Sequence, residues 1–170
     1  TAAYLLEEAG LDRVVIADWD IHHGNGTEQI FIEEDRILYI SLHQYPHFPG
    51  TGHHDVTGAG EGRGYTINIP LGTNITDDDF VQAMEGQVIP SIADFRPQFM
   101  LMSAGFDGHM SDPLASASLS SAVFGQITKM LKESADRHCG GKIVSFLEGG
   151  YNLNALAESA EYHLLALAGK

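Results

Sequence analysis

Residues 18–27 read DWDIHHGNGT and follow directly on the apolar run Val14–Ala17, which predicts a buried strand that ends in a glycine-bearing turn. Side chains two positions apart point to the same side of a strand, so Asp18, Asp20 and His22 are expected to converge where the strand ends. Two carboxylates and an imidazole in one place destabilise one another unless a cation lies among them. The stretch therefore predicts a metal site.

Composition and charge exclude several classes of protein. The 170 residues are 44% hydrophobic, and none of their apolar runs reaches the eighteen residues of a membrane span. The formal net charge of −14 argues against nucleic-acid binding and is compatible with attraction of a cationic substrate. A lone cysteine, Cys139, excludes a disulfide framework and fits a reducing compartment, so we expect a cytoplasmic protein with neither nucleic acid nor membrane as partner.

Apolar strands alternate with helices along the chain. We predict strands at 13–17, 36–42, 65–69 (stopped by Pro70), 99–103 and 142–147, and helices at 2–9, 27–34, after Thr76, at 120–137 and from Leu153 onward. This alternation indicates an α/β fold with a mostly parallel sheet covered by helices on both faces. We expect Ile30 and Phe31 to face inward on the second helix. The last helix is expected to bury five residues: Leu153, Leu156, Ala160, Leu164 and Leu167.

Three of these strands end in polar turns, and ligands of parallel sheets bind beyond the carboxyl ends of strands. Asp107 follows the fourth strand and is a plausible third ligand beside Asp20 and His22. Three protein ligands and one open position are typical of catalytic zinc, and the oxygen-rich set also accepts iron, cobalt or manganese. Tyr151 follows two glycines, so its hydroxyl could donate to an oxyanion; packing in a loop is the alternative.

The remaining histidines are weaker candidates. His53–His54 looks like a catalytic pair but lies in a glycine-rich loop, so we expect it on the surface. His43 and His47 lie near the end of the second strand, either behind the site or in solvent. His109 competes with Asp107 as a ligand. His163 is expected at the surface or in helix packing.

The stretch 18–27 resembles the metal-binding segment of the histone deacetylase family, which includes bacterial acetylpolyamine amidohydrolases. Further family-like segments follow in order, and their wording is similar to the class II branch. They are YISLH at 39–43, FPGTG at 48–52, SAGFD at 103–107, DPL at 112–114 and LEGGYN at 147–152. The resemblance implies the three-layer α/β/α fold of the arginase/deacetylase type.

The resemblance also implies roles for individual residues. Asp20, His22 and Asp107 would bind zinc (Fe²⁺ being possible), and Tyr151 would polarise the acetyl carbonyl and stabilise the tetrahedral oxyanion. The resemblance further implies a structural potassium ion and a narrow tunnel that surrounds the stem of the acyl-lysine. The potassium groups are Asp18, the Ser41 hydroxyl and the backbone carbonyls of Asp20, His22 and Leu42; the tunnel residues are Phe48, Gly149 and Gly150.

One departure concerns the general base, which in the family is a tandem histidine pair before the Asp-x-Asp-x-His strand. Only seventeen residues precede Asp18 and none is histidine, whereas His53–His54 comes after that strand. We therefore expect residues 1–170 to form a single domain, the carboxyl-terminal portion of a deacetylase catalytic domain, truncated on its N-terminal side. Alone it should bind metal weakly and turn over slowly or not at all.

The predicted function of the parent protein is zinc-dependent hydrolysis of N-acetyl (or longer acyl) amides on lysine side chains of proteins or on polyamines. The alternative is a catalytically silent module that binds metal or acyl-lysine. Arginase-like hydrolysis of a guanidine ranks last, because it predicts two manganese ions and more aspartate ligands than this chain offers. The oligomeric state is unknown.

Overall fold

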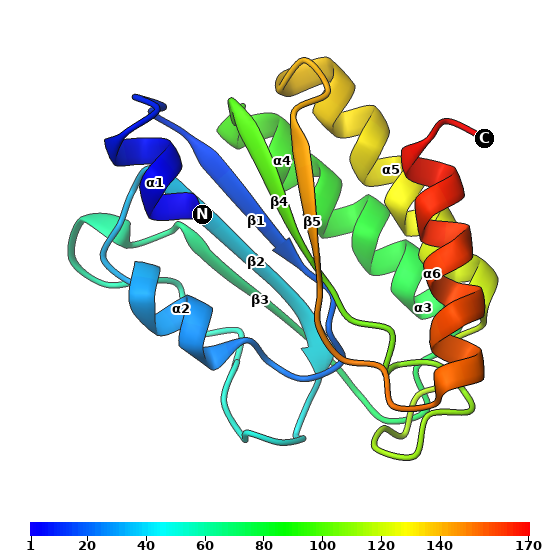
Figure 1. Cartoon of the computed structure of the whole chain (residues 1–170). Helices are drawn as coiled ribbons and strands as arrows, with labels where there is room; N and C mark the ends of the chain where they lie inside the picture. Colours follow the sequence, from blue (N-terminus) through cyan, green and yellow to red (C-terminus); the bar gives the residue numbers. More distant parts are fainter.

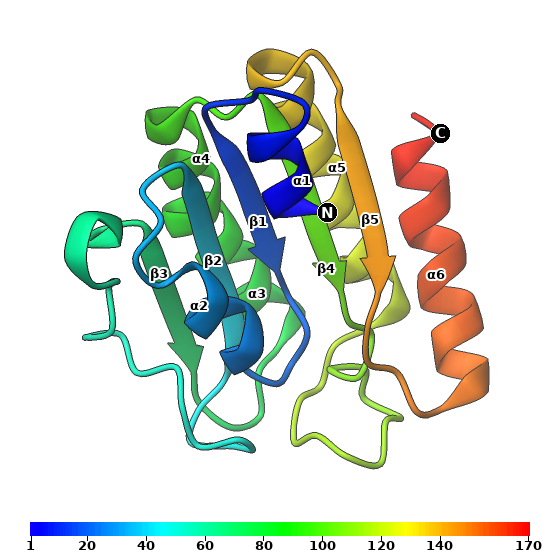
Figure 2. The ribbon, with the colours of Figure 1, turned by 60° about the vertical axis from the view of Figure 1, so that its left-hand side comes forward.

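Five parallel strands form one sheet in the computed structural model, which describes all residues 1–170. The strands are β1 (Val14–Asp18), β2 (Ile37–Gln44), β3 (Thr66–Leu71), β4 (Phe99–Ala104) and β5 (Ile143–Leu147). Their spatial order is β3-β2-β1-β4-β5, so β1 lies at the centre and the five arrows run in one direction (Figure 2). The prediction of a mostly parallel sheet is confirmed, and every pair is in fact parallel.

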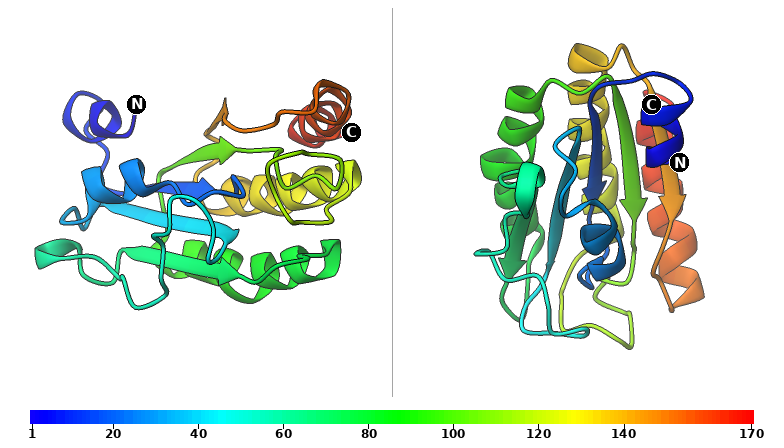
Figure 3. Two further views of the ribbon diagram at one scale, coloured as in Figure 1. Left: turned by 90° about the horizontal axis from the view of Figure 1, so that it is seen from below. Right: turned by 90° about the vertical axis from the view of Figure 1, so that its left-hand side faces the viewer.

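Helices cover the sheet on both faces. They are α1 (Ala2–Glu7), α2 (Asn25–Phe31), α3 (Asp77–Ala83), a π-helical segment (Met84–Val88), α4 (Ile89–Phe95), α5 (Ser121–His138) and α6 (Leu153–Leu167), with a short 3₁₀ turn at Gly60–Gly62. In Figures 1 and 3, α1 and α2 lie on one face, whereas α3, α4, α5 and α6 lie on the other. This is the predicted three-layer α/β/α arrangement. None of the helices is long and apolar enough to cross a membrane.

The two faces of the sheet bury cores of different size. Val15 and Ala17 of β1 point into a cluster of 26 buried residues under α3, α4 and α5, whereas Val14 and Ile16 point into a cluster of eight that includes residues of α1. Adjacent residues of a strand face opposite sides, which explains this division. A strand buried on both faces reads as a continuous apolar run, and Val14–Ala17 is one.

Two predictions about element ends and faces need correction. β3 continues through Pro70 to Leu71, because β3 is an edge strand and an edge tolerates a residue without an N–H. On α2, Ile30 is 73% exposed, whereas Phe31 packs against the smaller core as predicted. The Thr76 cap is confirmed: its hydroxyl accepts from the Asp79 N–H, and the Asp79 carboxylate accepts from the Thr76 N–H.

The predicted inner face of α6 was also wrong in part. Leu153 and Leu164 are 78% and 61% exposed, although Leu156 and Leu167 do pack against the core. The residues that face inward are small or polar, namely Ala155, Ser159, His163 and Ala166. Small residues allow close approach to α5, where a Cβ on Gly125 would lie 3.1 Å from the Tyr162 Cβ. The positions of the leucines therefore predicted only part of the buried face of α6.

His163 is the polar centre of the α5–α6 contact. Its Nδ1 lies 2.7 Å from the Thr128 hydroxyl and its Nε2 lies 3.0 Å from the Ser145 hydroxyl, so two hydroxyls satisfy both ring nitrogens. The ring also makes edge contacts with Trp19 and Phe106, at centroid distances of 5.7 Å. Burial lowers the pKa of His163 to about 4.

Stability is therefore expected to fall below neutral pH. Between the unfolded pKa of about 6.5 and the folded value of about 4, the unfolded chain binds more protons, so the free energy of unfolding decreases as pH falls through this window. The slope for one group is at most about 1.4 kcal/mol per pH unit. His163→Gln keeps both hydrogen bonds without the charge and should flatten the dependence of the urea midpoint between pH 6.5 and 5. Equal slopes for variant and wild type would contradict this role.

Candidate metal centre and active site

The carboxyl ends of β1, β4 and β5 lie together at one edge of the sheet, where the connecting loops gather in Figure 2. Asp18, the last residue of β1, pairs with Ser41 of β2 and Ser103 of β4. Asp20 and His22 follow β1 directly, and Asp107 follows β4. The parallel register thus brings together residues almost ninety positions apart, as the sequence predicted.

Asp20, His22 and Asp107 converge on one point. The His22 Nδ1 lies 2.9 Å from Asp107 Oδ2 and 3.2 Å from Asp20 Oδ1, and one potential ligand atom of each residue lies within 4.8 Å of the others. Backbone N–H groups fix the carboxylates: Ile21 donates to Asp107 Oδ1 at 3.1 Å, and Gly149 donates to Asp20 Oδ2 at 2.8 Å. Asp107 is fully buried, and the group is oriented before any ligand binds.

The electrostatics of this group favour a positive charge between its two carboxylates. Hydrogen bonding to the Asp107 carboxylate, and then to that of Asp20, raises the pKa of His22 to about 10. Burial raises the pKa of Asp107, whereas hydrogen bonds from His22 and Gly149 overcome burial at Asp20 and leave its pKa lowered. The three side chains therefore hold positive charge between two carboxylates. One nitrogen and two oxygen donors that converge in this way fit a zinc site.

Two glycines let the backbone approach these carboxylates. A Cβ on Gly149 would lie 2.6 Å from Asp20 Oδ2 and from the Asp107 Cγ, and a Cβ on Gly105 would lie 2.5 Å from the Asp20 Cα. The sequence assigned Gly149 to a tunnel border. The structure places its main chain directly against the predicted metal ligands, so the absence of a side chain there is a requirement of the site.

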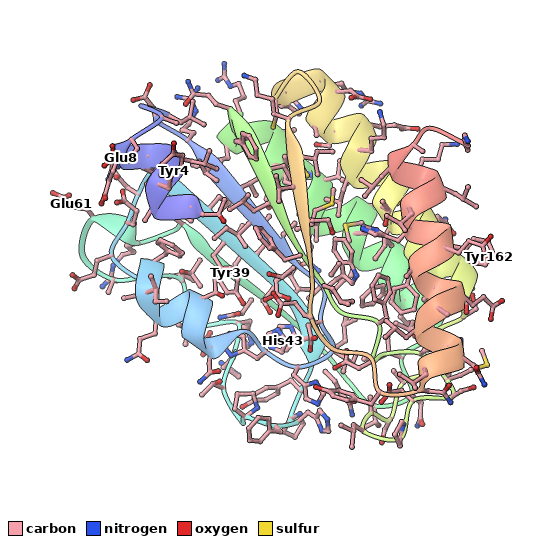
Figure 4. The ribbon with its side chains drawn as sticks, in the orientation of Figure 1. Tyr4, Glu8, Tyr39, His43, Glu61 and Tyr162 are labelled. Atoms are coloured by element: carbon pink, nitrogen blue, oxygen red, sulfur yellow. The ribbon has the colours of Figure 1, made fainter.

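Asp18 lies behind this group, nearer the sheet. Its carboxylate is buried, accepts from the Asp20 N–H at 3.1 Å and lies 3.1 Å from the Tyr39 hydroxyl. Burial, followed by the charge of Asp20, raises the pKa of Asp18 well above its ordinary value, and no lysine or arginine pairs with it. Tyr39 and His43, both on β2, are labelled in Figure 4. A second cation beside Asp18 would offset this burial of charge.

Tyr151 follows β5 and a glycine pair. Gly150 has φ of 144°, a conformation that favours glycine, and the Tyr151 side chain is 56% exposed. Desolvation, followed by the charges of Asp107, Asp20 and Asp112, raises the pKa of Tyr151. The phenol is therefore protonated at neutral pH and available as a hydrogen-bond donor.

Two aromatic rings flank His22. Phe48 is 76% exposed, and its ring meets the His22 ring edge-on with 6.4 Å between the ring centroids. The His47 ring stacks on the His22 ring with 4.9 Å between centroids and an interplanar angle of 27°. Exposure of a large apolar side chain beside a polar group is compatible with a substrate wall. The sequence left His47 undecided, and the structure places it against the predicted ligand.

The other histidines are not part of the ligand group. His109 bonds to the Ser121 hydroxyl at 3.1 Å and does not belong to the group formed by Asp20, His22 and Asp107. His43 is buried against the carbonyl of Gly52 at 2.9 Å. His53 and His54 have side chains 44% and 63% exposed and pair with Asp55, which confirms the surface expectation.

Sequence reasoning assigned no role to two carboxylates that support the site, Glu28 and Asp112. Glu28 lies 3.2 Å from the His23 ring and accepts from Asn68 at 2.6 Å, which ties α2 to β3. Asp112 accepts from the Tyr151 N–H at 2.7 Å. Asp112 directly precedes Pro113, which is a sequence signal of a turn. The contacts of Glu28 with His23 and of Asp112 with Tyr151 do not follow from spacing along the chain.

Comparison with known proteins gives a consistent picture. A family model described as the histone deacetylase domain matches residues 1–167. A "Probable deacetylase" of Archaeoglobus fulgidus is 39% identical over 173 residues, covering 96% of this chain and 48% of that protein. A "Histone deacetylase-like amidohydrolase" of Pseudomonas aeruginosa is 43% identical over 145 residues, covering 84% of this chain and 38% of that protein. The chain thus spans about half the length, or less, of these relatives.

Solved structures share the fold as well. The HDA15 HD domain superposes with a TM-score of 0.93 at 40% identity and covers 99% of this chain and 48% of that one. The histone deacetylase Clr3 superposes with a TM-score of 0.91 at 36% identity and covers 98% of this chain and 29% of that one.

Proposed function

The chain belongs to the histone deacetylase domain family, and from this premise we propose that its parent protein is a zinc-dependent deacetylase. Its substrates would be N-acetyl or longer acyl amides on lysine side chains of proteins or on polyamines, and its product the free amine. The observation that carries the proposal is the convergence of Asp20, His22 and Asp107 on one point at the sheet edge where Tyr151 also lies.

Zinc would be held by Asp20, His22 and Asp107, with Fe²⁺ as the second candidate because two of the three donors are oxygen. When bound there, the metal would polarise the amide carbonyl as a Lewis acid and would lower the pKa of a water molecule. Gly149 and Ile21 support this chemistry from the main chain, since their N–H groups hold the two carboxylates in orientation.

Tyr151 would act on the carbonyl oxygen of the substrate. Its protonated hydroxyl donates a hydrogen bond that strengthens as negative charge develops on that oxygen, which favours the transition state over the substrate. Phe48 and Gly150 would flank the aliphatic stem of the acyl-lysine, together with Gly149. The formal charge of −14 favours the approach of a cationic peptide or polyamine.

A potassium ion is proposed beside Asp18, with the Ser41 hydroxyl and the carbonyls of Asp20, His22 and Leu42. The support is the buried Asp18 carboxylate, which accepts from the Asp20 N–H and the Tyr39 hydroxyl and forms no ion pair with a lysine or arginine. Ser41 and Leu42 are buried next to it on β2. A monovalent cation there would stabilise the ionised form of Asp18 and, through it, the turn that carries Asp20.

A second candidate function follows from the general base, because no histidine pair of this chain is assigned to that role. His53 and His54 are exposed and pair with Asp55, so we do not propose this tandem pair as the general base. A module that binds metal or acyl-lysine without turnover therefore remains the alternative. We propose a cytoplasmic location, with the buried free Cys139 in support, and neither nucleic acid nor membrane as partner.

The test is hydrolysis of an acetyl-lysine peptide and of an N-acetylated polyamine by the full-length protein loaded with zinc. Turnover of either substrate that is lost on chelation and restored by zinc supports the deacetylase. Zinc-dependent binding of the peptide without release of acetate would favour the silent module. Neither binding nor turnover would reject both.

Tyr151→Phe is expected to lower kcat on the order of 10² to 10³-fold, the cost of losing one oxyanion donor. The phenol touches none of the metal ligands through a hydrogen bond, so zinc content should stay at the wild-type value. Steady-state kinetics and elemental analysis of the same preparations check this. Tyr162→Phe, on the exposed side of α6, is the matched control and should keep full activity. Full activity in Tyr151→Phe would reassign that residue to packing.

A further inference from the structure

Asp112 lies in the turn after β4, and its carboxylate bridges two loops. Oδ1 accepts from the Leu114 N–H at 3.0 Å within its own turn, and Oδ2 accepts from the Tyr151 N–H at 2.7 Å across to the turn after β5. The residue is only 8% exposed. No lysine, arginine or histidine forms an ion pair with it, so main-chain N–H groups supply its contacts.

A second hydrogen bond runs between the same two turns in the other direction. The Asn152 amide donates to the Ser111 carbonyl at 3.0 Å, while its oxygen caps α6 by accepting from the Asn154 and Ala155 N–H groups. Two hydrogen bonds therefore connect the loops, one between Ser111 and Asn152 and one between Asp112 and Tyr151. Tyr151 lies between Gly150 and the start of α6, and these contacts fix its main chain.

The chemistry of Asp112 favours a role beyond holding a turn. The Leu114 and Tyr151 N–H groups bond to different oxygens of the Asp112 carboxylate. In the same orientation asparagine would present its NH₂ group, a donor, to one of these two N–H groups. Bonds from N–H to a buried carboxylate are charge-assisted and stronger than neutral ones. The shorter of the two contacts of Asp112 is the one to Tyr151.

We propose that Asp112 is a positioning residue that sets the main chain of Tyr151, and so the reach of its hydroxyl toward the substrate carbonyl. Asp107 stands five positions earlier in the same loop between β4 and α5, so one segment carries both a proposed metal ligand and the anchor of the phenol. The loop that carries Asp107 is thereby tied to the main chain of Tyr151. This inference rests on the proposed deacetylase function.

The first experiment is independent of activity and uses the full-length zinc-loaded protein. Amide hydrogen exchange at Tyr151 is measured in wild type, Asp112→Asn and Asp112→Ala. The anchor predicts faster exchange at Tyr151 in Asp112→Ala and an intermediate rate in Asp112→Asn, which keeps one acceptor. The control is Asp77→Ala, which removes an equivalent carboxylate that accepts from the Ser120 N–H at 2.8 Å and its hydroxyl at 2.6 Å. Unchanged exchange at Tyr151 in both Asp112 variants overturns the proposal.

The second experiment is a double-mutant cycle on kcat with Tyr151→Phe. Misplacement of the phenol by about 1 Å predicts a loss of up to about 10²-fold in Asp112→Ala, with KM changed less than about threefold. If Asp112 acts through the Tyr151 hydroxyl, adding Asp112→Ala to Tyr151→Phe should cost less than about threefold more. Additive losses, as expected for Asp77→Ala in the same background, would overturn the proposal. A wild-type protein without turnover would instead reject the proposed function.

Discussion

Asp107→Ala is expected to remove zinc from the protein and to abolish turnover. Asp107 is fully buried, contributes one of three converging donors and holds the Ile21 N–H with its second oxygen. Changing a residue that merely orients a ligand costs about 10- to 100-fold in metal affinity, so removal of a ligand should exceed that loss. The measurement is zinc per chain by elemental analysis after dialysis, together with the rate of acetyl-lysine hydrolysis.

Two further variants make this result specific. Asp107→Asn keeps an acceptor for the Ile21 N–H but loses the charge, so it should retain the fold and still bind zinc weakly. Asp77→Ala removes a carboxylate that accepts from the Ser120 N–H and is not one of the proposed metal ligands. This variant should keep the wild-type zinc content. Zinc retained by Asp107→Ala at the wild-type ratio would show that the ligand assignment is wrong.

Gly149→Ala is expected to be almost as damaging, although it adds a single methyl group. The new Cβ would lie 2.6 Å from Asp20 Oδ2 and closer still to Asp107 Oδ2, so both carboxylates or the β5 turn must move. A shift of about 1 Å in a catalytic group costs on the order of 10²-fold in rate. We expect kcat to fall by at least about this factor, with weakened zinc retention.

Gly26→Ala provides the matched control for the glycine variant. Gly26 lies in α2, and a Cβ there meets nothing within 4 Å. Alanine also favours a helix over glycine by about 1 kcal/mol, so activity should stay at the wild-type level and stability should not fall. Equal activity in Gly149→Ala and Gly26→Ala would mean that the β5 turn does not control the ligands.

The sheet and the ligand group were predictable because their signals are local. A continuous apolar run such as Val14–Ala17 indicates a strand buried on both faces, and alternation with helices indicates parallel order. From that order, the convergence of Asp20, His22 and Asp107 at one edge follows without a structure. The resemblance then supplied the roles of Tyr151 and Asp18, which position along the chain alone left open.

Other features were not predictable because they depend on three-dimensional distances. The inner face of α6 is set by close packing on α5, so Ala155 and His163 face inward while Leu153 does not. The contact of Gly149 with the ligands and the bond between Asp112 and Tyr151 join residues brought together only by the fold. Periodicity and composition carry no information about such contacts.

The central position of β1 has a consequence for the order in which the protein folds. On one side of β1, Val14 pairs with Ile37 of β2, which is 23 positions later in the sequence. On the other side, Val14 pairs with Phe99 of β4, which is 85 positions later. Pairings this distant in sequence close large loops and slow folding. During synthesis, Asp20 and His22 therefore emerge long before Asp107 can join them. If these residues bind a metal as we propose, its stable capture would come late, after the two halves of the sheet have paired.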